Sequence, residues 1–329
     1  MDTQNYSTEQ QNTLPTQNYR LFFTGKGSDL FKISLVNIFF SILTLGFYYP
    51  WAKVRMTKYV YHNTLLADSP FEYHATAMQI LRGLLKVIVF ILVFYALIFG
   101  SIFILGQDNN VTSIIILLAE LIILALLPVA IHGGLRFRAS KSSWRNIFFG
   151  YRGNLKEFAL LFYKNILLTI FTLGIYSSWF SANMQQYIFG HLRFGNIQFG
   201  YCGLGRDRFI INLKGIFLSL ITIGLYIFWW RAEITNYDID NTYLVQDNRE
   251  IRLDANLTGW QIFKFEIVNS FLLLFTLGLA YPWVLKRTLL LIYENVIVER
   301  GFDPNTIIQT EGDYSDATGE DFLDVLEVI

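Results

Sequence analysis

Long apolar stretches alternate with polar stretches along most of this chain of 329 residues. Six of the apolar stretches approach the ~20 residues that a helix needs to cross a bilayer. None of them shows the alternation of a membrane barrel strand. The pattern therefore predicts an all-α polytopic membrane protein with about six transmembrane helices. The expected spans are residues 30–51, 84–105, 111–131, 158–179, 210–230 and 262–283.

A phrase of the form Thr-Leu-Gly-x-Tyr-x-x-Trp recurs, with small changes, at the end of four of these stretches. In a membrane helix a Thr hydroxyl bonds a carbonyl one turn back, Gly permits a kink, and Tyr and Trp favour the membrane–water interface. We interpret the phrase as a structural corner at a membrane exit. The alternative is that four such corners converge on a site, as broken helices do in transporters. The residues concerned are Thr44, Gly46, Trp51, Thr172, Gly174, Trp179, Thr222, Gly224, Trp229, Thr276, Gly278 and Trp283.

The similarity between the four copies extends beyond the corner. Three copies have an Asn seven residues before the Thr, and three have a Tyr eight residues after the Trp. Short segments of apolar–polar alternation follow, which are typical of half-buried extramembrane strands. We therefore expect four quasi-repeated helix-corner units in a single membrane domain, residues 19–308, between a disordered polar tail (1–18) and a disordered acidic tail (309–329). The units lie near 30–75, 158–201, 209–255 and 262–308, with a helical hairpin at 84–131 inserted between the first two.

Basic residues give two possible topologies. With six crossings, the loops after the first, third and fifth helices hold 15 Lys and Arg residues and the other side holds ten. The positive-inside rule then places both termini outside. In the rival topology each corner turns back before crossing, so that all basic loops share one side and only Gln107–Asn110 faces the other. Segment length favours six crossings, because residues 30–51 are long enough to span.

Composition supports the membrane and narrows the chemistry. The chain is 53% hydrophobic and 16% charged, against about 25% charge in soluble domains. Its zero net charge gives no indication of nucleic-acid binding. The single cysteine, Cys202, excludes a disulfide within one chain, and His62, His74, His132 and His191 are scattered. We expect no metal, no cofactor and no enzymatic activity.

The repeated residues also resemble a known family, the YjgN-like bacterial inner-membrane proteins. The resemblance runs from about Phe22 to about Ile307, and it implies a multi-pass location in the bacterial inner membrane without implying an activity. The third copy departs from the pattern at Gly215 and the fourth at Leu291. The residues that carry the resemblance are Asn37, Thr44-Leu45-Gly46, Tyr48, Trp51, Tyr59 and Asn63-Thr64, with Phe23-Thr24-Gly25 before the first helix.

Polar side chains inside the expected helices are the candidates for a functional site. They are Glu120, Lys164, Asn37, Asn165 and Asn269. A carboxylate at membrane depth costs ~2.5–3.5 kcal/mol unless it is paired, so a Glu120–Lys164 pair is one hypothesis. The other interpretation is that Lys164 snorkels and that the Asn residues join helices. If these five residues line one path, the protein is a transporter or channel for a small solute or ion. The alternative is an envelope scaffold or lipid-interacting protein, with membrane lipids as its partners.

Overall fold

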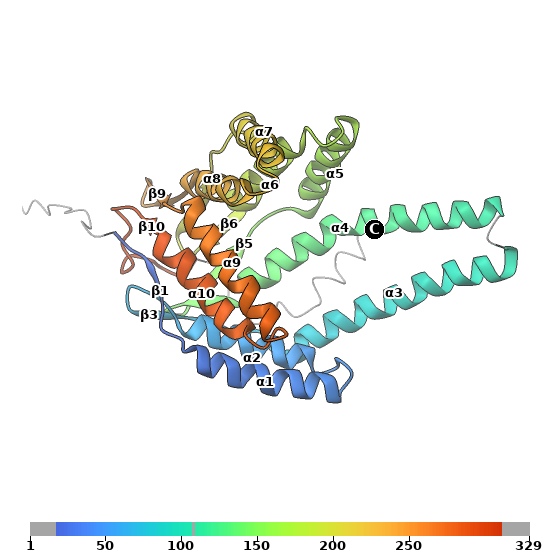
Figure 1. Cartoon of the computed structure of the whole chain (residues 1–329), viewed down its shortest axis with the longest axis horizontal. Helices are drawn as coiled ribbons and strands as arrows, with labels where there is room; N and C mark the ends of the chain where they lie inside the picture. Colours follow the sequence, from blue (N-terminus) through green and yellow to red (C-terminus); the bar gives the residue numbers. More distant parts are fainter. Residues whose placement is uncertain (1–17, 107–108, 311–329) are drawn as a thin grey trace, which may run out of the picture.

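Helices that pack in consecutive pairs make up most of the structure, a computed structural model that describes residues 18–106 and 109–310. The two expected disordered tails fall almost entirely outside these residues. In each pair a short connection joins the helices, and both ends of the pair lead into strands (Figure 1). The pairs are α1 (Gly27–Leu43) with α2 (Tyr49–His62), α3 (Ala77–Leu105) with α4 (Asn110–Ser140), α5 (Leu155–Phe171) with α6 (Ser177–His191), α7 (Gly205–Ile221) with α8 (Ile227–Asp240), and α9 (Gly259–Phe275) with α10 (Tyr281–Asn295).

A sheet of ten short antiparallel strands connects the helix pairs. Its strand order is the order of the sequence, and a backbone pair between Tyr19 and Val298 brings its first and last strands together. The sheet thus closes almost into a barrel. The strands are β1 (Leu21–Phe23), β2 (Thr64–Leu66), β3 (Ser69–Tyr73), β4 (Ser142–Trp144), β5 (Ile147–Tyr151), β6 (Leu192–Phe194), β7 (Ile197–Tyr201), β8 (Thr242–Gln246), β9 (Arg249–Ala255) and β10 (Val296–Val298).

The prediction of an all-α fold is wrong because of this sheet. The alternating segments expected at the ends of the first three units are the strands β3, β7 and β9, but most strands have only three to five residues, and their pattern does not show that they join in one sheet. Their partners are spread along the chain, so pairing rather than local pattern specifies them. The turns agree with this pairing: Ala67-Asp68, Arg145-Asn146 and Asp247-Asn248 all have positive φ angles, as the tightest hairpins require.

The helices form a ring around the end of the sheet. The second helix of every pair packs against the first helix of the next pair, and α10 packs against α1. One backbone hydrogen bond recurs in all five units, between the end of the second helix and the residue just after the last strand before the pair. In each case the N–H of the residue after the strand donates to the carbonyl oxygen at the helix end. The pairs, donor first, are Thr24 and Asn63, His74 and Lys141, Arg152 and His191, Cys202 and Asn241, and Asn256 and Asn295. The α3–α4 hairpin therefore occupies one of five equivalent positions in the ring.

Apolar side chains from all four strand hairpins fill the inside of the sheet. Trp144, Phe194, Leu244 and Ile251 form its buried core. Phe302 and Ile307, which follow β10, complete the same cluster. Burial of these apolar side chains is the main driving force for closing the sheet.

The helix before each corner ends at the Thr, not at the Trp. The backbone of the next two residues is left-handed, as in Leu45 (φ 50°) and Gly46 (φ 88°), and the chain then starts a second helix that runs back along the first. The first helices of all four corner pairs have 17 residues, a rise of about 25 Å at ~1.5 Å per residue. Each is therefore shorter than the ~30 Å hydrocarbon core.

The prediction of six transmembrane helices is also wrong. Within the described residues, only α3 and α4 are long and apolar enough to cross a membrane. Only 6% of the apolar stretch of α3 and 17% of that of α4 are buried, whereas the core helix of a soluble protein is mostly buried. The corner explains the error, since the apolar stretch from residue 30 to 51 contains most of α1, the turn and the start of α2, and is not one continuous helix.

Candidate functional site

The four corners use their repeated side chains for local bonds. The Thr44 hydroxyl donates to the carbonyl oxygen of Phe40 and accepts from the backbone N–H of Tyr48. The same two bonds recur at Thr172, Thr222 and Thr276. The hydroxyl thus caps one helix and positions the start of the next. The Thr hydroxyls therefore serve the bend.

The three repeated Asn residues are buried, each in its own helix pair. Asn37 donates to the carbonyl oxygen of Ala52 across the pair, and the Asn165 side-chain oxygen accepts from Asn183. Asn269 is 3% exposed, and neither atom of its amide group has a hydrogen-bond partner. In the remaining unit the position is Gly215, against which the indole of Trp230 packs so closely that a Cβ atom would lie 2.3 Å from the ring. The side chain at this position therefore joins or spaces the two helices of a pair.

Glu120 and Lys164 do not meet. Glu120 lies on the projecting hairpin in α4 and Lys164 lies in α5, and both side chains are exposed. No salt bridge joins them in the described structure. The five predicted polar residues thus come from four different helices, and the structure does not bring them together.

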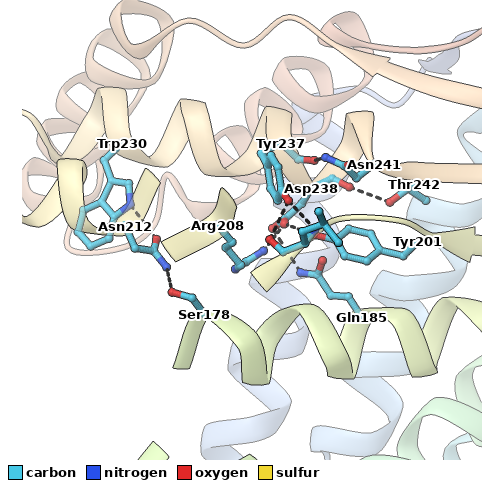
Figure 2. Close-up of polar contacts among 11 residues, drawn as sticks. Ser178, Gln185, Tyr201, Arg208, Asn212, Trp230, Tyr237, Asp238, Asn241 and Thr242 are labelled. Atoms are coloured by element: carbon cyan, nitrogen blue, oxygen red, sulfur yellow. Dashed lines mark hydrogen bonds and ion pairs between the residues drawn. The ribbon is translucent and has the colours of Figure 1, made fainter. Parts of the chain in front are cut away.

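A largely buried polar network that was not among the predicted sites lies between the α5–α6 and α7–α8 pairs (Figure 2). Arg208 of α7 forms a salt bridge with Asp238 of α8, and their side chains are only 14% and 24% exposed. The phenol of Tyr201 donates to the same carboxylate at 3.0 Å, and Gln185 of α6 donates to its second oxygen at 3.3 Å. Burial and the neighbouring carboxylate raise the pKa of Tyr201, which keeps the phenol a donor.

Comparison of the units shows that this ion pair is a local exception. Arg208 lies four residues after the N-cap of its helix, where α1, α5 and α9 have the buried residues Leu30, Phe158 and Ile262. Asp238 follows Tyr237, and the residues at its place in the other corner pairs are Val60, Ile188 and Ile292. The fold is thus compatible with an apolar contact here. The only signal in the sequence was an Arg and an Asp at positions that are apolar in the other copies.

A second chain of contacts ties the same units nearer to the corners. Asn212 of α7 donates to the Ser178 hydroxyl of α6 at 2.8 Å, and its side-chain oxygen accepts from the Trp230 indole at 3.1 Å (Figure 2). Together with the ion pair, these bonds hold the α5–α6 pair against the α7–α8 pair. No cluster of three or more His, Cys, Asp or Glu residues that could hold a metal is found in the described part of the chain.

Curated relatives of this chain are inner-membrane proteins by name. Inner membrane protein YjgN of Salmonella typhimurium (strain LT2) is 32% identical over 140 residues, which is 43% of this chain and 33% of the relative. Inner membrane protein YjgN of Escherichia coli (strain K12) is 27% identical over 160 residues, 48% of this chain and 38% of the relative. The matched part thus spans about a third of the first relative and 38% of the second. No solved structure matches the chain.

Membership of a family is shown over most of the sequence. The family described as "Bacterial protein of unknown function (DUF898)" matches residues 18–201 and 230–325. The relatives named YjgN agree with the resemblance noted from the corner residues, which is thereby confirmed, and their names support an inner-membrane location. The chain is a member of the DUF898 family, related to the inner membrane proteins YjgN.

Proposed function

We propose that this protein is a lipid-interacting scaffold of the inner membrane rather than a transporter. In this arrangement the α3–α4 hairpin crosses the bilayer, and the sheet lies in water on one side. The four corner pairs dip into the membrane from that same side without crossing it. The protein would thus hold five lipid-facing hairpins in one ring.

The tips of the corner pairs are the observation that carries the proposal. The residue after the Thr is apolar in every copy and almost fully exposed: Leu45 is 97% exposed, Leu173 94%, Ile223 95% and Leu277 92%. Each pair begins and ends at the sheet, so its tip is the part farthest from the sheet (Figure 1). Four exposed apolar residues at equivalent tips fit insertion into a membrane.

Charge supports shallow insertion. No Asp, Glu, Lys or Arg occurs in residues 33–52, 165–192, 215–230 or 267–285, which contain the four tips. In the third unit, the seven helical residues from Gly215 to Ile221 reach about 10 Å. This is the depth at which amphipathic elements sit in the headgroup and acyl boundary, ~5–10 Å.

The placement of the polar residues argues against the transport hypothesis. A small apolar-walled cavity of about 190 Å³ between α1 and α10 includes Asn37 in its lining, but none of the other four predicted residues. Glu120 and Lys164 are exposed on separate helices, and Asn165 is bonded within its own pair. A shared polar path would need these groups to face one cavity.

The first experiment introduces a charge at the tips. In the quadruple variant Leu45→Asp, Leu173→Asp, Ile223→Asp, Leu277→Asp we expect normal thermal unfolding in detergent, because these side chains pack against almost nothing. In vesicles, quenching of tryptophan fluorescence by brominated lipids should fall strongly, because charged tips avoid the acyl region. The quadruple Ala variant is the control and should keep most of the quenching. Unchanged quenching in the Asp variant would refute insertion of the tips.

A second experiment tests the topology. Single cysteines replace Asp68 and the exposed Gln198 in a Cys202→Ser background, and a membrane-impermeant maleimide labels them in oriented vesicles. The proposal predicts that both react from the same side. With six crossings they would react from opposite sides, and that result would exclude the ring of shallow hairpins.

A further inference from the structure

A cavity of about 380 Å³ lies where the ends of α2, α4 and α10 meet the strands. Its walls are mostly apolar, with Val60, Leu135, Phe71, Phe149 and Leu192 among them. This volume is in the range of small-molecule sites, ~300–1,000 Å³. The cavity contains none of the five predicted polar residues and lies apart from the Arg208–Asp238 network.

Hydroxyl groups gather on the polar part of the lining. The Ser142 hydroxyl donates to the phenol oxygen of Tyr61 at 3.1 Å, and Thr64 and Tyr293 share a hydrogen bond of 3.4 Å. Burial raises the pKa of Tyr293, so its phenol stays protonated. The Ser142 and Thr64 hydroxyls also bond the carbonyl oxygens of Arg138 and Val60, each at 2.8 Å. Because a hydroxyl has a single proton, these groups are bonded to one another and to the backbone, and they form a polar wall rather than a set of donors for an anion.

One cation, Arg138, completes the lining. It lies in the last turn of α4, its side chain is exposed, and no carboxylate pairs with it within residues 18–106 and 109–310. Arg138 occupies in α4 the position that Asp238 has in α8 and Val60 has in α2. Each lies four residues before the Ser or Thr that begins the next strand, namely Ser142, Thr242 or Thr64. The guanidinium group presents a planar fork of donors, which suits a phosphate or carboxylate group.

The level of Arg138 along the spanning hairpin indicates where a ligand would come from. Arg82, Lys86 and Arg136 lie on the same sheet-proximal ends of α3 and α4. From Lys86 to Leu105 the helix rises about 29 Å at ~1.5 Å per residue, close to the ~30 Å of the hydrocarbon core. Arg138 thus falls at headgroup depth on the side of the sheet.

We propose that this cavity binds an anionic amphiphile, with its phosphate at Arg138 and the start of an acyl chain along the apolar wall. The volume is too small for a whole two-chain lipid, so the rest of the lipid would remain in the bilayer. The inference rests on the proposed function only in that the bilayer supplies the ligand. It does not require the four tips to insert.

Native mass spectrometry of the full chain in detergent tests the proposal. The probes are phosphatidylglycerol, phosphatidylcholine with the same chains, and inorganic phosphate. We expect phosphatidylglycerol to bind most tightly, and Arg138→Gln to weaken its binding about tenfold or more, as loss of a charge-assisted hydrogen bond does. Arg82→Gln removes the same charge from an exposed site outside the cavity lining and should change binding less than twofold.

A second variant tests the contact with the acyl chain independently of the contact with the headgroup. Leu135→Trp fills the apolar wall and keeps Arg138, and it should also lower phosphatidylglycerol binding, with a normal thermal melt showing that it folds. Equal losses in Arg138→Gln and Arg82→Gln, or none in either, would overturn the site. Competition by inorganic phosphate at equal affinity would overturn a lipid as its occupant. These outcomes are independent of the tip experiment, which is measured in vesicles.

Discussion

Left-handed backbone is the residue-scale device that sets the direction of each helix pair. Leu173 has φ 52° and Gly174 has φ 92°, and the other three corners have nearly the same angles. A side chain rarely adopts such an angle at the Gly position, whereas glycine does so without steric cost. The Gly of the repeated phrase is thus explained by its dihedral angle, not by close packing, because nothing lies within 4 Å of a Cβ atom there.

Gly174→Ala should therefore destabilise the protein by about 1–2 kcal/mol, because Ala in left-handed backbone is strained. Gly83→Ala is the matched control, since that glycine lies in the helix α3 with equally open surroundings. Ala has the higher helix propensity, so the control should be neutral or gain up to about 1 kcal/mol. Thermal unfolding in detergent measures both. Equal effects of the two changes would contradict the role of the dihedral angle.

At the scale of elements, one side chain clamps the two ends of a corner pair together. Tyr237 near the end of α8 accepts from the backbone N–H of Leu204 at 2.7 Å and donates to the Leu204 carbonyl oxygen at 2.9 Å. Tyr59 and Tyr187 make the same contacts with the N-caps of α1 and α5. Where the Tyr is replaced by Leu291, a capping box of Thr258 and Gln261 satisfies the N-terminus of α9 instead. The start of α9 thus has a local cap in place of the contact with a Tyr from the second helix of its pair.

Tyr237→Phe should cost about 1–3 kcal/mol, because it removes the phenol from a backbone donor. Hydrogen exchange of the first turn of α7 should rise more than exchange of the first turn of α9, which has its own cap. Tyr95→Phe is the control on α3, where the side chain is 52% exposed and the change should have little effect. Exchange that rises equally in α7 and α9 would argue against a local clamp.

At the scale of the whole molecule, equivalent positions of the ring differ in chemistry. The α3–α4 pair alone has the length and hydropathy of a membrane span among the described helices. The α7–α8 pair has an ion pair where the α1–α2 pair has Leu30 and Val60. Removal of one partner leaves an uncompensated buried charge, which typically costs ~3–5 kcal/mol, whereas exchange of both for apolar residues is often neutral.

Arg208→Leu and Asp238→Val should each be strongly destabilising, by roughly 3 kcal/mol after allowance for the partial exposure of both side chains. The double variant restores the residues of the first unit and should be more stable than either single variant, although Tyr201 and Gln185 lose their acceptor. A double-mutant cycle of thermal unfolding measures this coupling. Simple addition of the two losses would show that the pair does not act as a unit.

The sequence by itself determined the apolar stretches, the place of every corner, and the family. These features are local: hydropathy over ~20 residues and a Thr-Gly-Trp spacing are readable without a partner. Tertiary structure decided whether the chain crosses or turns back at Leu45-Gly46, because that depends on two dihedral angles and on packing between α1 and α2. It also decided the sheet, whose strands find partners far along the chain, and it brought Arg208 to Asp238 across 30 residues. Contacts between distant residues leave no period in the sequence, and so only the folded ring reveals them.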